Sequence, residues 1–171
     1  MKESYVMSTY EKLSAMISED ELERIAFRFR KAIIEAVDSG TIREMSSFPI
    51  GCCTYASNLL QRYLSEREIF TWYMSGQYGY GFNSESHAWL ETYNGIVIDI
   101  TGDQYKYKAL MFTTPVYVGS RADGFHDKFR LSAPMEYSNT KDPFVSYSDF
   151  DRRYDAVMRY YVEHVDTKVK I

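Results

Sequence analysis

The sequence predicts an α+β protein in which helices pack on a small antiparallel sheet. Helical spacing of apolar residues dominates the first and last parts of the chain, whereas short runs rich in aromatic and β-branched residues occupy the middle. Segregation of helices from strands along the chain is typical of α+β folds. Its 171 residues are enough for one domain of ordinary size, so we predict a single domain over residues 1–171.

The first predicted helix spans about residues 19–38. Ser18 and Glu21 form a capping box at its start, and Ser39 followed by Gly40 ends it. Apolar residues recur at helical spacing between these signals, which gives the helix one face for the core. These residues are Leu22, Ile25, Ala26, Phe29, Ile33, Ala36 and Val37.

A second helix is predicted to begin at about Cys52, and a third to span about residues 149–165. Between them, strands are predicted at 69–75, 87–92, 96–101 and 115–119. The remaining stretch, 120–146, is polar and is predicted to be irregular.

The two central strands are joined around Asn94-Gly95, and their register follows from the apolar pattern. A two-residue turn would mix apolar and polar residues on both faces of the hairpin. A three-residue loop, 93–95, instead places Trp89 opposite Asp99. That register collects Ala88, Leu90, Ile96, Ile98 and Ile100 on one face. One face must be buried, so we predict the three-residue loop.

Composition excludes several classes of function. The net charge of −4 offers no broad cationic face for nucleic acid, and we read Arg28, Arg30 and Lys31 as part of a solvated helix face. No run approaches 18 apolar residues and no secretory signal is visible, so we expect no membrane partner and a cytoplasmic location. We expect no cofactor, and the oligomeric state is left open.

Cys53 is the candidate nucleophile. The Gly51-x-Cys53 stretch opens a predicted helix, and a helix N-terminus favours a thiolate over a thiol. We prefer Cys53 to its neighbour Cys52, because Cys53 shares a helix face with Ala56 and Leu60. A pair of buried structural cysteines is the alternative.

The hairpin supplies the partners of this thiol. In the predicted register, Asp99 lies diagonal to His87 on the same face of the sheet, within side-chain reach. A thiol, an imidazole and a carboxylate that orients the imidazole make up a nucleophilic triad. We therefore predict a Cys53–His87–Asp99 triad.

These residues resemble the transglutaminase-like core of the papain-like superfamily. The resemblance rests on Gly51-x-Cys53 at a helix start, on the stretch from His87 to Glu91 and on Asp99-x-Thr101, and it covers about residues 48–105. It implies a cysteine hydrolase or acyltransferase that acts on a peptide or protein amide through a thioester. A catalytically inactive binding module on the same fold is the alternative, and a structural protein with chance placement of these residues is a third reading.

Further residues are assigned around the triad. The resemblance implies that Gln104 lines the site, and Trp89, on the same strand face as His87, is predicted to contact substrate or to shield the pair from water. In papain-like peptidases, a Gln shortly before the cysteine helps to hold the oxyanion. This chain has no Gln at that place. We leave the second oxyanion donor open between Ser47 and a tyrosine. His126 is predicted to be a solvated loop residue.

Overall fold

A computed structural model of the chain describes residues 17–137 and 147–166, and within the last helix it describes the side chains of residues 149–161. Within these residues the helices are α2 (Glu19–Asp38), α3 (Cys53–Ser65) and α4 (Tyr147–Asp166). The strands are β1 (Thr71–Tyr78), β2 (Glu85–Thr92), β3 (Ile96–Asp99), β4 (Tyr117–Ser120), β5 (Arg130–Leu131) and β6 (Met135–Glu136). Short 3-10 helices include η3 (Gly102–Tyr105) and η4 (His126–Lys128).

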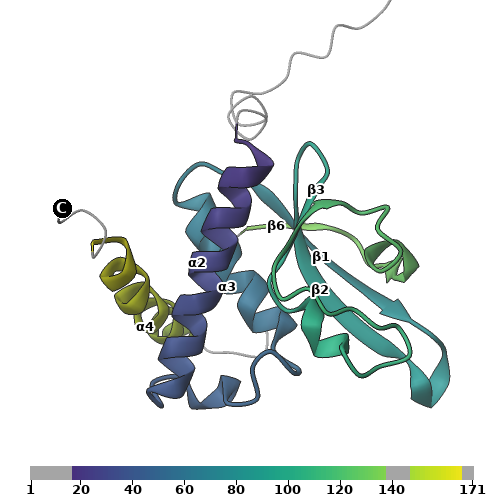
Figure 1. Ribbon diagram of the computed structural model, residues 1–171, viewed down its shortest axis with the longest axis horizontal. Coiled ribbons are helices and arrows are strands. Elements are labelled where there is room, and N and C mark those ends of the chain that lie inside the picture. The colour runs from purple at the N-terminus through teal and green to yellow at the C-terminus, as the bar shows by residue number, and fades with distance from the viewer. Residues whose placement is uncertain (1–16, 138–146, 167–171) are drawn as a thin grey trace, which may run out of the picture.

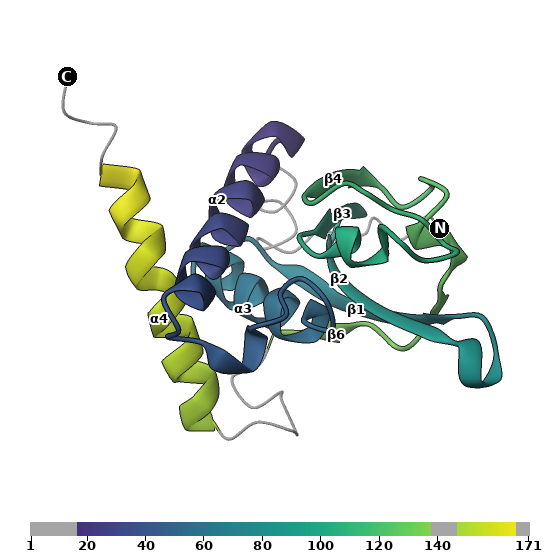
Figure 2. The same cartoon turned by 60° about the horizontal axis from the view of Figure 1, so that its bottom comes forward.

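The helices and the sheet form separate layers (Figures 1 and 2). The strands of the described residues form one antiparallel sheet in the order β4-β3-β2-β1-β5, and β6 also pairs with β1. Helices α2 and α3 cover one face of this sheet, and α4 packs on the side of α2 that faces away from it (Figure 2). The predicted α+β class with an antiparallel sheet is confirmed.

Local signals in the sequence explain where the first helices begin. The Ser18 hydroxyl accepts a hydrogen bond from the Glu21 N–H, which caps α2 where the sequence predicted its start. Helix α3 begins at Cys53, two residues after Gly51, whose φ of +68° suits a residue without a Cβ. The Ser57 hydroxyl then donates to the carbonyl oxygen of Ala88 and ties α3 to β2.

The predicted hairpin register is confirmed. Leu90 pairs with Ile98 and Glu91 with Val97, the pairing that a three-residue loop requires. The predicted apolar face is also confirmed, since it packs against α2 and α3. Its members there are Ala88, Leu90, Ile96, Ile98 and Ile100.

A second core covers the opposite face of the sheet, and the sequence did not predict it. Aromatic residues of η3 and of the segment between η3 and β5 pack against Trp89 and Val97. These residues are Tyr105, Phe112, Phe125 and Phe129. Their segment includes part of the stretch 120–146, which was predicted to be irregular. The apolar residues of this stretch follow neither a helical nor a strand period, so the sequence does not indicate that they are buried. Its described part also contains the short strands β5 and β6.

Gly76 allows this cover to approach the sheet. It pairs with His87 on one side and Leu131 on the other, and a Cβ there would lie 2.9 Å from the Arg130 carbonyl oxygen and 2.9 Å from the Phe129 Cβ. We expect Gly76→Ala to lower the free energy of unfolding by about 1–3 kcal/mol in urea denaturation, as overpacking does. Gln77→Ala, at the adjacent exposed position, is the control. Equal stability of the two variants would contradict this account.

Among the described residues, no helix combines the length and the apolar character needed to cross a bilayer.

Candidate active site

Cys53 occupies the first turn of α3, where backbone N–H groups have no partner within the helix. Its side chain is half-buried and lines a cavity together with His87 of β2, whose hydrogen bonding and charge lower the pKa of the thiol. Cys52 faces elsewhere: its buried thiol donates to the Ile50 carbonyl oxygen at 3.4 Å. The structure thus brings Cys53, and not Cys52, to the predicted partners.

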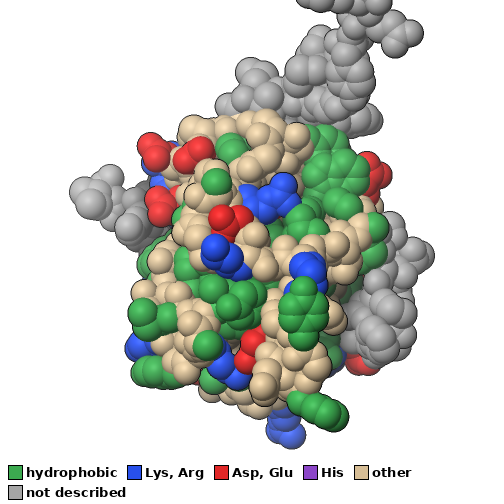
Figure 3. Space-filling model, turned by 90° about the vertical axis from the view of Figure 1, so that its right-hand side faces the viewer, with side chains coloured by type: hydrophobic (Ala, Val, Ile, Leu, Met, Phe, Trp, Pro, Cys, Tyr) green, Lys and Arg blue, Asp and Glu red, His purple; other side chains and the backbone are tan. Residues whose placement is uncertain are grey.

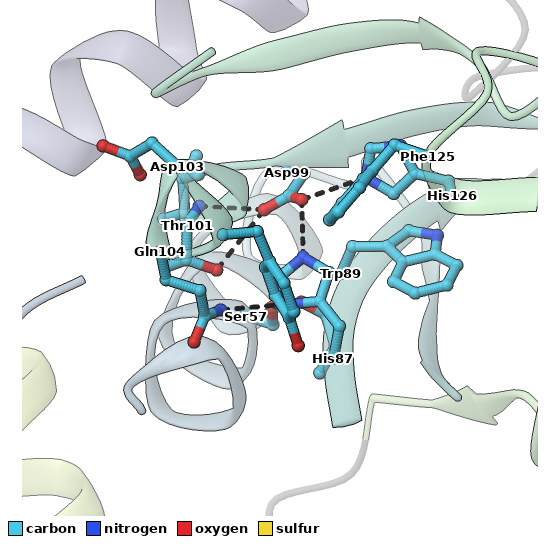
Figure 4. A network of polar contacts seen from close by, with 12 residues as sticks. Ser57, His87, Trp89, Asp99, Thr101, Asp103, Gln104, Phe125 and His126 are labelled. Carbon is cyan, nitrogen blue, oxygen red and sulfur yellow. Dashed lines mark hydrogen bonds and ion pairs between the residues drawn. The ribbon is translucent and has the colours of Figure 1, made fainter. Parts of the chain in front are cut away.

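His87 and Asp99 are in direct contact. His87 Nε2 lies 2.7 Å from Asp99 Oδ2, and both side chains are buried (Figure 4). The other carboxylate oxygen of Asp99 accepts the backbone N–H of Thr101 at 2.8 Å and its hydroxyl at 3.3 Å. Because Nε2 of His87 faces Asp99, the other ring nitrogen, Nδ1, is the one available to interact with Cys53.

The charges of this cluster favour a thiolate–imidazolium pair. Burial alone would lower the pKa of His87, but the charge and hydrogen bond of Asp99, followed by the contact with Cys53, raise its pKa to about 9. Burial would raise the pKa of Cys53, but the hydrogen bond and charge of His87 outweigh it and hold that pKa below its ordinary value. The pKa of Asp99 is depressed despite its burial, chiefly by the charge of His87 and hydrogen bonds from His126 and His87.

Gln104 lies on the open side of His87. Its Oε1 accepts the Gly51 N–H at 3.2 Å, which fixes the orientation of the amide and turns Nε2 toward His87 Nδ1, 3.0 Å away. After His87, the same amide also contributes to lowering the pKa of Cys53. When His87 is neutral, Nδ1 accepts this N–H; when His87 is protonated, Gln104 and His87 both donate to the thiolate.

An arginine from α2 holds the segment that carries Gln104. Arg30 donates to the Ile100 carbonyl oxygen at 2.6 Å and forms a two-pronged ion pair with Asp103 at 2.9 and 2.8 Å. The reading of Arg30 as part of a solvated face is therefore wrong. Its side chain is only 11% exposed, because its charge is matched by a carboxylate and by carbonyl oxygens that no sequence period reveals.

Trp89 does not contact the opening of the site. The side chain is fully buried behind His87, with ring centroids 5.7 Å apart, and its Nε1 donates to Glu91 at 3.1 Å. The predicted contact with substrate is thus not supported by this position, since the second core covers the ring. The burial agrees with the other role considered for Trp89, which is to keep water from the His87–Asp99 pair.

His126 is the main component of this cluster that sequence reasoning missed. It is buried, and its Nε2 lies 2.9 Å from the same Asp99 oxygen that contacts His87. Its Nδ1 lies 2.5 Å from Asp123 Oδ2. The prediction of a solvated loop histidine is wrong. The only signal in the sequence was an Asp three residues before a His, a spacing that is common in exposed turns.

A small cavity adjoins Cys53. It has a volume of about 160 Å³ and is lined by Cys53 and His87 together with mostly small or polar residues of β1, β2 and the start of α3. The other lining residues are Thr54, Tyr73, Ser75, Gly76, Gln77, Ser86, Ala88 and Ser132. None of them is acidic or basic, so the cavity suits an uncharged group.

The side chains predicted as candidates for the second oxyanion donor have other hydrogen-bond partners. Ser47 is on the Cys52 side, where its hydroxyl donates to the Ile50 carbonyl oxygen at 2.9 Å. Tyr73 lines the cavity, but its hydroxyl donates to Thr54 at 3.2 Å. The Gln104 amide, by contrast, lies 3.0 Å from His87 Nδ1.

Two histidines and a carboxylate also converge as metal ligands would. One donor atom each from His87, Asp99 and His126 lies within 4.8 Å of the others, and all three residues are buried. Each histidine nitrogen, however, is already at hydrogen-bond distance from the shared Asp99 oxygen, with a proton between them. A metal would have to displace both protons and enter a site closed to solvent, so the geometry favours a hydrogen-bonded chain.

Comparison of the chain with protein-family models, with curated proteins and with solved structures gives no match. What the site does must therefore be argued from its own geometry.

Proposed function

We propose that this protein is a cysteine-nucleophile enzyme that acts on a peptide or protein amide through a thioester. One observation carries the proposal: a half-buried thiol at a helix N-terminus contacts a buried His87–Asp99 pair beside a cavity. Cys53 is the nucleophile, His87 the base and acid, and Asp99 the residue that orients His87. The resemblance to the transglutaminase-like core points to the same roles.

The chemistry follows from this arrangement. The Cys53 thiolate attacks the amide carbonyl carbon, and the carbonyl oxygen becomes an oxyanion. The C–N bond then breaks, and His87 Nδ1 gives its proton to the leaving amine. Water or a second amine next attacks the thioester, loses its proton to His87 and releases Cys53. Throughout, Asp99 accepts from Nε2 and keeps Nδ1 directed at the reacting atoms.

Two donors are available for the oxyanion. The Cys53 backbone N–H lies in the first turn of α3, where it has no helical partner. The Gln104 amide, directed by Gly51 toward the thiol and His87 Nδ1, would supply the second. Gln104 would thus take the place of the glutamine that papain-like peptidases carry before the cysteine.

The cavity indicates the kind of group that binds beside the scissile amide. Hydroxyl and amide side chains line it, and it contains no side chain with a full charge apart from the Cys53–His87 pair. A small, uncharged polar side chain of a peptide therefore fits better than an acidic, basic or large apolar one.

Alkylation of Cys53 by iodoacetamide across pH 4–9 tests the proposal. The pKa of Cys53 is lowered and that of His87 is raised to about 9. The thiolate–imidazolium pair is therefore populated at pH values between these two pKa values. We expect Cys53 to react with an apparent pKa well below the free value of about 8.5, and His87→Ala to restore an ordinary profile.

Cys52 is the internal control, because burial raises the pKa of its thiol and it should stay slow in both proteins. An inert Cys53, or one that titrates normally in wild type, would remove the nucleophile and leave the binding-module reading in its place.

A further inference from the structure

We propose that His126, held by Asp123, is a positioning residue for Asp99, so that the triad continues into a buried chain His87–Asp99–His126–Asp123. The inference rests on the proposed function of Cys53, His87 and Asp99. It adds a second histidine, contributed by a loop distant in sequence, that the catalytic chemistry does not itself require.

Hydrogen bonds occupy both oxygens of the Asp99 carboxylate. One oxygen accepts both donors of Thr101, and the other accepts from His87 at 2.7 Å and from His126 at 2.9 Å. A carboxylate has about four acceptor positions, so none remains free. Figure 4 shows Asp99 between the two imidazoles. Without His126 the carboxylate would keep an empty acceptor position in a site closed to water, and the side chain could turn away from His87.

The loop that presents His126 is organised around Asp123. One oxygen of Asp123 accepts the backbone N–H groups of Phe125 and His126 at 2.9 and 2.8 Å, and the other holds His126 Nδ1. The ring also stacks on Tyr117, with centroids 5.2 Å apart. Asp123 thus fixes both the backbone and the ring, so that Nε2 points at Asp99.

Both ring nitrogens of His126 lie at hydrogen-bond distance from carboxylate oxygens, Nδ1 from Asp123 and Nε2 from Asp99. The ring is buried, so these two contacts satisfy both of its polar atoms and fix its position. The chain therefore keeps Asp99 in place against His87.

Two substitutions separate this role from simple filling of the core. In His126→Gln the amide nitrogen replaces Nε2 and can still donate to Asp99, whereas in His126→Asn it replaces Nδ1 and faces Asp123 instead. Both variants are neutral amides, which makes them a matched pair.

The measurements are the iodoacetamide rate of Cys53 at pH 7 and the proton NMR signal of the His87 Nε2–H, with circular dichroism to check folding. We expect His126→Asn to slow alkylation about tenfold, equivalent to one unit of pKa, and to lose the NMR signal to exchange. His126→Gln should keep the signal and react within about threefold of wild type.

Each result has a separate meaning. Wild-type reactivity in folded His126→Asn, or equal losses in both variants, would overturn the positioning role while leaving the triad intact. An unreactive Cys53 in wild type would instead remove the proposed function, and the positioning role with it.

Discussion

Asp99→Asn is expected to reduce turnover of an amide substrate by about 10⁴-fold, the effect of giving a catalytic histidine the wrong tautomer. The contacts of Asp99 explain why. Its Oδ1 accepts from Thr101, so the carbonyl oxygen of an asparagine must take that position. The NH₂ group then replaces Oδ2 and donates to His87 Nε2. That moves the ring proton to Nδ1, which can no longer accept from Cys53.

The same substitution can be measured without knowing the substrate. Acylation of Cys53 by p-nitrophenyl acetate reports the nucleophile directly, and we expect the Asn variant to lose nearly all of it at pH 7. Asp38→Asn is the matched control, because Asp38 is an exposed residue at the end of α2. Retention of wild-type acylation by Asp99→Asn would show that Asp99 does not orient the base.

Asp99→Asn should also change how stability depends on pH. The depressed pKa of Asp99 gives stability that is present above its ordinary value of 3.8 and is lost as the pH falls. The raised pKa of His87 gives stability that is complete below 6.5 and is lost as the pH rises through about 9. Without the carboxylate, both limbs of the stability profile should flatten.

The register of one hairpin carried most of what the sequence could predict about this site. Because Ala88, Leu90 and Ile98 share a buried face, the same register places His87 and Asp99 on the opposite face. Cys53 could be placed as well, since a glycine and a helix start are local signals. Apolar periodicity predicts the direction of side chains reliably in elements with one buried face, and this hairpin is such an element.

The second core and its polar contacts could not be predicted in that way. Phe125, His126 and Phe129 lie on a loop and a short 3-10 helix, where side-chain direction follows from turns such as the one around Asp123. Arg30 was misread for a related reason, because its partners lie 70 or more residues away in sequence. Loops that pack over a sheet are specified by tertiary contacts, and a single sequence shows only their composition.

Substitution of Gln104 is expected to have the second large effect on turnover. Loss of one oxyanion donor typically costs about 10²–10³ in turnover, and we expect Gln104→Ala to lose this much. The loss should depend on the reaction followed. Acylation by p-nitrophenyl acetate passes through a tetrahedral oxyanion and should fall by the full amount. Alkylation by iodoacetamide forms no oxyanion, so it should fall only by the loss of one hydrogen bond to the thiolate.

Gln104→Glu is the matched variant for this test. A carboxylate there keeps the size of the side chain but faces the Gly51 N–H with one oxygen and His87 Nδ1, beside the thiolate, with the other. It offers no donor to an oxyanion and repels the thiolate, so both acylation and alkylation should fall and the apparent pKa of Cys53 should rise. Equal losses of acylation and alkylation in Gln104→Ala would mean that the amide only tunes the thiol. A selective loss of acylation would assign the second oxyanion donor to Gln104, from a segment that follows the triad carboxylate in the chain.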